Sequence, residues 1–176
     1  LEDKAPYYDG KSNTLVWHRL VNDRYQIMEY SFDEQEERQL TDDSVNNMEP
    51  SRFGEMIVWQ RWVKNNWEII LFDGKNQTQL TDSIQHDLAP SVRDDFVMWN
   101  SSNGPNNQVY KVYDFKTTEI NTFDNLDGVS AMNPRMVLLY DKKYENGDVV
   151  TQGYDIKTGN IIPVSAVPGD LPENIP

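Results

Sequence analysis

The phrases QLTDD at residues 39–43 and QLTDS at residues 79–83 decide the fold, because they begin 40 residues apart in a chain of 176. QLTDD is followed by SVNNMEPSRFGEMIVWQRW, and QLTDS is followed by IQHDLAPSVRDDFVMWNSS. Laid over each other, the two segments pair Pro50 with Pro90 and Trp59 with Trp99. A period of this length indicates an internal structural repeat.

The repeat extends in both directions. Upstream, DKAPYYDGKSNTLVWHRL places Pro6 and Trp17 at the same positions, with two extra residues in the turn. Downstream, DGVSAMNPRMVLLYDK carries Ser130 and Leu139 there. Each copy continues with a second alternating segment (YQIMEYSF, WEIILFDG, QVYKVYDF or VTQGYDIKTG) and then a short third one (ERQLTD, QTQLTD, TEINTF or GNIIPV). Every copy therefore predicts four short strands.

The residues of these segments favour strands and not helices. Apolar residues alternate with a period of two, β-branched and aromatic residues dominate, and Gly, Asn and Asp cluster in the gaps. Four-stranded units that recur every 40 to 45 residues are typical of β-propeller blades, which bury both faces by stacking. We predict an all-β propeller at residues 1–165, with four-stranded blades at about 3–42, 47–82, 87–124 and 127–165. The Pro-rich segment AVPGDLPENIP, residues 166–176, is predicted to be a linker or tail.

The repeated phrase resembles one family. The pattern LT…N/D-x-x-P-S-x-x-G/D-x-x-I/V-x-W…I-x-x-F-D-G is similar to the WD-like repeat of TolB-type propellers. The resemblance is strongest in residues 37–99, clear in 3–36 and weak in 125–165. Two features depart from the family: its Ser-Pro-Asp-Gly turn is replaced by SRFGE, SVRDD and AMNPR, and most of its members carry more than four repeats. The resemblance implies a bacterial, periplasmic or extracellular protein that contacts a protein partner through one propeller face.

Composition excludes several other functions. The net charge is −13 and the pI about 4.4, so nucleic acid and anionic membrane surfaces are poor partners. Apolar runs are far too short for membrane insertion. There is no Cys, which rules out disulfides, thiolate metal sites and a Cys nucleophile. The chain begins at Leu1 without an initiator Met, so we expect a mature product or an excised domain.

One polar position recurs three residues before each Pro equivalent. Its four occupants allow two interpretations: each closes the turn between blades through its own backbone, or together they ring the channel with oxygen ligands for Ca²⁺. These residues are Asp3, Asn47, Asp87 and Asp127. Apart from this Ca²⁺ we predict no cofactor. Asp42 and Asp82, in the repeated phrases, are predicted to be turn residues.

The aromatic residues divide into two groups. Trp17, Trp59 and Trp99 recur at one position and are predicted to form core between blades. Trp62 and Trp67 do not recur, and they flank a hairpin in WQRWVKNNWEI. Exposed aromatic residues beside a polar loop suit protein or sugar binding. The alternative is that these two Trp pack on each other across the hairpin.

The predicted partner-binding residues lie where the repeats disagree: Trp62, Trp67, Arg61 and His86. No catalytic residue is predicted, since no nucleophile, phosphate loop or zinc spacing is recognisable. We expect a non-catalytic recognition or scaffold module that binds a protein. The alternatives are an accessory propeller of a larger hydrolase or peptidase, and a glycan-binding adhesin module.

Overall fold

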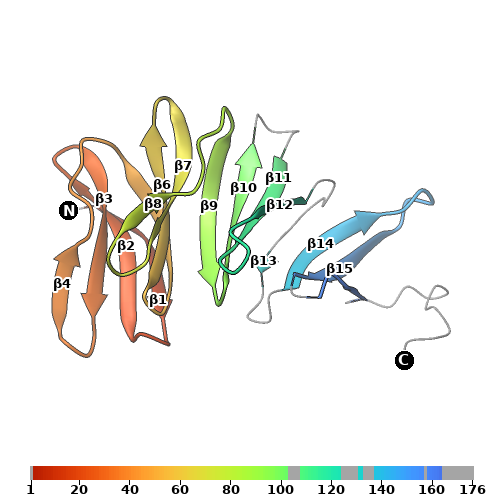
Figure 1. Cartoon of the computed structure of the whole chain (residues 1–176), viewed down its shortest axis with the longest axis horizontal. Helices are drawn as coiled ribbons and strands as arrows, with labels where there is room; N and C mark the ends of the chain where they lie inside the picture. The colour runs from red at the N-terminus through yellow and green to blue at the C-terminus, as the bar shows by residue number, and fades with distance from the viewer. Residues whose placement is uncertain (1, 103–107, 124–130, 133–136, 157, 164–176) are drawn as a thin grey trace. The chain divides into compact units, whose positions relative to one another are not determined.

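The chain is built of β-strands. A computed structural model describes residues 2–102, 108–123, 131–132, 137–156 and 158–163 (Figure 1). Sixteen strands form four four-stranded antiparallel sheets, and no helix occurs in the described ranges. The chain divides into two compact units, residues 1–124 and 125–176. The predicted fold class and the four strands per repeat are confirmed.

Three sheets belong to the first unit, and each sheet follows chain order. The first contains β1 (Asp3–Asp9), β2 (Thr14–Val21), β3 (Arg24–Ser31) and β4 (Glu36–Gln39). The second contains β5 (Asn47–Phe53), β6 (Met56–Val63), β7 (Asn66–Phe72) and β8 (Gln77–Gln79). The third contains β9 (His86–Arg93), β10 (Phe96–Ser102), β11 (Gln108–Asp114) and β12 (Ile120–Phe123).

The second unit holds the fourth sheet. Its strands are β13 (Ala131–Met132), β14 (Val137–Lys143), β15 (Val149–Asp155) and β16 (Ile161–Pro163). The predicted tail at 166–176 lies outside the described residues.

The core of the first unit lies between neighbouring sheets. One cluster joins Val16 and Ile27 of the first sheet to Trp59 of the second. Another joins Val58 of the second sheet to Trp99 of the third. Both Trp side chains are fully buried, which confirms their predicted place between sheets. Each face of the second sheet packs against a neighbouring sheet, so both of its faces are apolar.

A β-bulge interrupts the first strand of each of these three sheets, which is β1, β5 or β9. The residue before the repeated Pro of each sheet has a positive φ: 48° at Ala5, 54° at Glu49 and 50° at Ala89. The pairing register shifts at the same places. In two cases the preceding sheet binds the bulged N–H: Glu49 N donates to His18 Nδ1 (3.3 Å), and Ala89 N donates to Gln60 Oε1 (2.8 Å). The bulges thus tie consecutive sheets together.

The repeated Gln-Leu-Thr has a physical role. In the first sheet the amide of Gln39 donates to the carbonyl of Thr41 (2.7 Å), and the Thr41 hydroxyl accepts from Ile27 N (2.9 Å). The second sheet repeats both bonds with the same distances, through Gln79, Thr81 and Ile69. The phrase therefore holds the connection to the next sheet against the third strand.

Candidate recognition face

The connections between sheets gather at one end of the first unit. Because neighbouring strands are antiparallel, the start of the first strand, the turn between the second and third, and the end of the fourth share that end. We call it the loop end; it comprises the hairpin turns 22–23 and 64–65 and the connections 40–46 and 80–85. Both turn residues of each hairpin have positive φ, as type I′ turns require.

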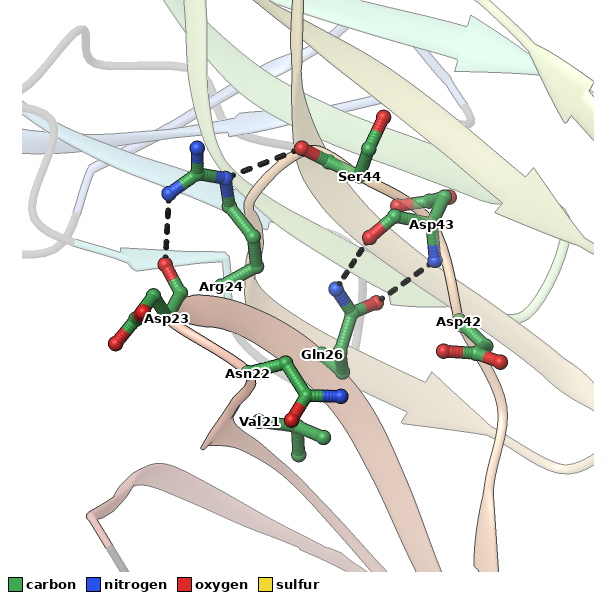
Figure 2. A pocket seen from close by; sticks show the side chains of 8 residues that line it. All are labelled: Val21, Asn22, Asp23, Arg24, Gln26, Asp42, Asp43 and Ser44. Carbon is green, nitrogen blue, oxygen red and sulfur yellow. Dashed lines mark hydrogen bonds between the residues drawn. The ribbon is translucent and has the colours of Figure 1, made fainter.

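A polar cleft of about 500 Å³ opens at the loop end beside the first hairpin (Figure 2). Arg24 spans it, donating to the carbonyls of Ser44 (3.1 Å) and Asp23 (2.8 Å). Gln26 lies deeper and donates to the carbonyl of Asp43 (2.8 Å). The full lining is Val21, Asn22, Asp23, Arg24, Gln26, Asp42, Asp43 and Ser44. Asp42 is exposed in this connection, as is its counterpart Asp82 in the next one.

Three of the four predicted binding residues come together at the second hairpin. Trp62 and Trp67 are cross-strand partners, and their rings meet edge to face at 5.2 Å. The His86 ring stacks on Trp62 at 5.9 Å, with an interplanar angle of 19°. His86 Nδ1 also accepts from Trp67 N (3.3 Å), so a neutral imidazole carries its proton on Nε2. All three are half-buried, whereas Ile84, two residues before His86, is 87% exposed.

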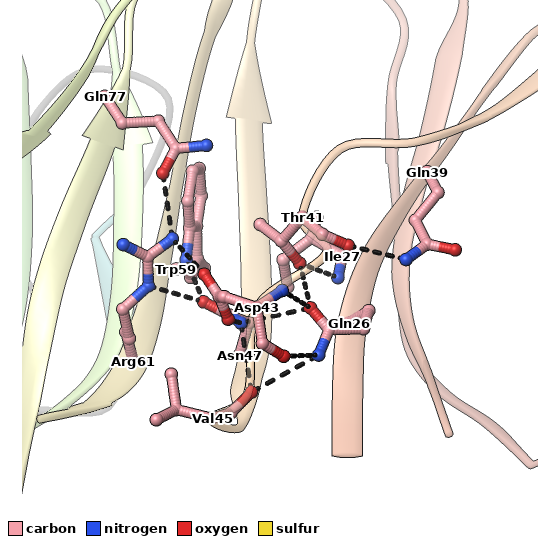
Figure 3. A network of polar contacts seen from close by, with 10 residues as sticks. All are labelled: Gln26, Ile27, Gln39, Thr41, Asp43, Val45, Asn47, Trp59, Arg61 and Gln77. Carbon is pink, nitrogen blue, oxygen red and sulfur yellow. Dashed lines mark hydrogen bonds and ion pairs between the residues drawn. The ribbon is translucent and has the colours of Figure 1, made fainter. Parts of the chain in front are cut away.

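The fourth predicted binding residue, Arg61, has a different role. Its guanidinium donates to Asn47 Oδ1 (2.8 Å) and Gln77 Oε1 (2.8 Å), and pairs with Asp43 (3.0 Å) (Figure 3). Arg61 is adjacent to Trp62 in sequence, but alternation in a strand turns it to the opposite face. Its role as a partner-binding residue stays a prediction.

The recurrent Asp or Asn binds the Trp of its own sheet. Asn47 Oδ1 accepts from Trp59 Nε1 (2.8 Å), and Asp87 Oδ1 accepts from Trp99 Nε1 (2.9 Å). Asp3 Oδ1 accepts from Trp17 Nε1 (3.1 Å). For Asn47 this bond adds to one with its own turn, since its Nδ2 donates to the carbonyl of Val45 (3.3 Å). The indole bond is a further contact that neither expected role includes.

A basic side chain accompanies each of these oxygens. Arg19 donates to Asp3 (2.6 Å), Arg61 donates to Asn47, and Lys111 Nζ lies 3.9 Å from Asp87 Oδ1. The hydrogen bond from Arg19 lowers the pKa of Asp3 below its usual range. At these three positions a basic side chain of the protein therefore lies beside the recurrent oxygen. Asp127 lies outside the described residues.

No group of three or more His, Asp or Glu side chains in the described ranges is arranged to hold a metal ion. The Ca²⁺ ring stays a prediction. In the same ranges no helix is long and apolar enough to cross a membrane.

A second cleft, of about 320 Å³, lies between the first two sheets. Its buried Glu29 pairs with Arg52 and with Arg38 (3.2 Å), and Arg52 also donates to Ser12 Oγ (2.9 Å). Two guanidinium groups thus share the one buried carboxylate of Glu29.

Comparison with known proteins informs the fold alone. No protein-family model and no curated protein matches the chain. Among solved structures, TolB from Acinetobacter baumannii is 14% identical with a TM-score of 0.61; the match covers 93% of this chain and 43% of that one. The β-propeller domain of the Trilobed protease from Pyrococcus furiosus is 11% identical with a TM-score of 0.62, over 93% and 57% of the two chains. A puromycin-hydrolyzing peptidase from Mycobacterium tuberculosis is 12% identical with a TM-score of 0.62, over 93% and 28%.

The chain thus spans less than two thirds of the length of each of these proteins. Their low identities carry no information about activity, whereas their shared architecture agrees with the four sheets described above. The chain has a TolB-like β-propeller repeat fold.

Proposed function

We propose that the chain is a non-catalytic recognition module that binds a protein partner through its loop end. The observation that carries this proposal is the group of Trp62, Trp67 and His86 beside the exposed Ile84. Aromatic side chains held in place by their neighbours offer a large apolar contact area at little entropic cost, as protein interfaces favour. The cleft at the first hairpin lies at the same end of the unit and supplies carbonyl and carboxylate groups for the polar rim of such an interface.

The histidines support a non-catalytic role. The chain has 2 His, and each uses Nδ1 to accept a backbone N–H, from Glu49 for His18 and from Trp67 for His86. A neutral imidazole has one acceptor nitrogen, so neither ring retains a site for taking a proton from a nucleophile.

A periplasmic or extracellular location is part of this proposal. It rests on the likeness to TolB and on no feature of the composition.

The second candidate is an accessory propeller of a larger hydrolase or peptidase. It is favoured by the matches to a peptidase and to a protease domain, of which this chain spans 28% and 57%. The full-length gene decides between the candidates: a hydrolase domain in the same polypeptide supports the accessory role.

Glycan binding is the less favoured use of the aromatic group. His86 stacks on Trp62 and so occupies a ring face that a sugar would need. Glycan-array binding that is lost in Trp67→Ala, with the fold intact, would favour the glycan.

The proposal is tested by photo-crosslinking in the native host. A photoreactive amino acid at position 84 is expected to crosslink a discrete protein, while the same group at Ile120 is not. Ile120 is the matched control, because it is also an exposed apolar residue (44%) but lies on the outer strand β12. Equal crosslinking from both positions, or none from position 84, would contradict recognition through the loop end.

A further inference from the structure

Two equivalent junctions, between the first and second sheets and between the second and third, differ in their buried polar groups. In the first junction, Gln26 and Asn47 are both buried (Figure 3). Gln26 Nε2 donates to the carbonyls of Asp43 (2.8 Å) and Val45 (3.3 Å). Gln26 Oε1 accepts from Thr41 Oγ1 (2.7 Å) and from Asn47 Nδ2 (3.3 Å). The carboxamide therefore uses both its donor and its acceptor.

In the second junction, carboxyl groups replace both amides. Glu68 stands where Gln26 does, because Thr81 Oγ1 donates to Glu68 Oε2 (2.6 Å) and also accepts from Ile69 N. Asp87 stands where Asn47 does, bound to the Trp of its sheet. Their exposed fractions are 2% for Glu68 and 0% for Asp87. Two acids thus occupy a site that elsewhere holds two neutral groups.

The charges around Glu68 do not balance two ionised carboxylates. Asp87 and Asp82 add negative charge from β9 and from the connection before it. The cation at this junction is Lys111 of β11, 3.9 Å from Asp87 Oδ1 and 3.4 Å from Gln85 Oε1. Arg61 is paired with Glu68 in the register of β6 and β7, but its guanidinium bonds Asn47 and Asp43. His86 is turned to Trp62 and Trp67.

We propose that Glu68 is a proton-binding site: when protonated it is a neutral carboxylic acid that reproduces the carboxamide of Gln26, and its ionisation loosens the junction beneath the connection 80–85. A protonated carboxyl presents both a donor group and an acceptor oxygen, as the carboxamide of Gln26 does in the first junction, whereas an ionised carboxylate only accepts. One proton also leaves Asp87 and Lys111 as the single opposite-charge pair.

Burial is the main effect that raises the pKa of Glu68 above its usual value, and Asp87 and Asp82 add to it. Hydrogen bonds from Thr81 and from the backbone of Ser83 oppose the rise. The proposal rests first on the matched geometry of the two junctions, and it does not depend on the proposed recognition function.

The sign of the pH effect follows from linkage. An unfolded Glu titrates near pH ~4.3. Above that pH the folded chain keeps a proton that the unfolded chain has lost. The stabilisation from Glu68 is therefore complete at low pH and declines as the pH rises to the pKa of the folded chain.

The test compares the protein with Glu68→Gln by urea unfolding between pH 5 and pH 9, followed by Trp fluorescence. The ratio of their unfolding constants, protein over variant, is expected to rise with pH by up to about tenfold per unit, and then to level off. The matched control is Glu36→Gln, which removes an exposed carboxyl on β4 and should leave the ratio unchanged with pH. A ratio for Glu68→Gln that is constant over this range overturns the proposal.

A second measurement does not depend on any variant folding. In the ¹³C spectrum of the native protein, one Glu carboxyl should titrate above the ordinary range, and the Trp99 indole N–H, bound to Asp87, should shift with the same midpoint. If every Glu carboxyl titrates near ~4.3, the proposal is wrong.

Discussion

At the residue scale, the constant spacing between a polar residue and a Trp explains how buried polar groups are tolerated. Asn47 lies 12 residues before Trp59, and Asp87 lies 12 residues before Trp99. In each pair the side-chain oxygen satisfies the buried indole N–H, which would otherwise cost about 1–3 kcal/mol. The amide and the acid both serve this bond because each presents an acceptor oxygen to the indole.

The role of His18 is defined by a bond to the next sheet. It is buried, and its Nδ1 accepts from the bulged Glu49 N–H, as Gln60 accepts from Ala89 one sheet later. Its Nε2 is buried and makes no hydrogen bond to the described part of the chain. Burial, with a smaller contribution from Lys4, lowers the pKa of His18, and Glu2 opposes the shift.

We predict that His18→Gln is tolerated, because a Gln already makes the equivalent bond, while His18→Ala loses about 2 kcal/mol by leaving the Glu49 N–H unpaired. The unfolded His binds a proton near pH ~6.5, which the folded imidazole resists. The native protein should therefore lose stability relative to His18→Gln as the pH falls below that value. Urea unfolding at pH 8 and pH 5.5 measures both effects. Equal stability of the Ala and Gln variants at pH 8 would refute the proposed bond.

At the element scale, each Gln-Leu-Thr phrase fastens a connection to the third strand of its own sheet. The Thr hydroxyl is the central group, since Thr41 accepts from Ile27 N and donates to Gln26 Oε1. Ile27 lies on β3 just beyond the residues that pair with β4, so without Thr41 its buried backbone N–H would have no partner.

We predict that Thr41→Val lowers the free energy of unfolding by about 1–3 kcal/mol, because the isosteric change deprives the buried Ile27 N–H of its acceptor. Thr41→Ser should lose less, since it keeps the hydroxyl. The control is Thr78→Val on the exposed strand β8, for which a change within about 0.5 kcal/mol is expected. Thermal unfolding monitored by circular dichroism gives the three values. A Thr41→Val variant as stable as the control would exclude this role of the phrase.

The sequence predicts elements better than it predicts contacts. The repeat positions of Pro50 and Trp59, together with alternation, predict the strands because side-chain period and burial follow directly from a strand's geometry. The positive φ of Glu49 was not predictable, since residues before Pro ordinarily avoid such conformations. A bond from the preceding sheet holds this bulge, and that sheet lies far away in sequence.

At the scale of the whole molecule, the repeat predicts the architecture and only part of the candidate site. Trp62, Trp67 and His86 were predicted from their departure from the repeat, and they do meet at the loop end. The fixed interval between Asn47 and Trp59 was a signal for the indole bond, but its meaning depends on a bulge that brings the two side chains together. Glu68 was missed because its difference from Gln26 matters only once both are known to be buried in equivalent networks.

The first unit contains its own apolar core. Both apolar clusters lie within residues 1–124, and so do the hydrogen bonds that join its three sheets. All 5 Trp of the chain also lie there, so their fluorescence reports on this unit alone.

We predict that a fragment of residues 1–124 unfolds cooperatively in urea, with a blue-shifted Trp emission before the transition, because Trp59 and Trp99 are shielded from water by neighbouring sheets. The matched control is the same fragment with Trp59→Ala, which removes the main side chain between the first two sheets and should lose about 3–5 kcal/mol. A fragment whose emission changes gradually with urea, without a transition, would show that the three sheets depend on residues beyond 124 for their stability.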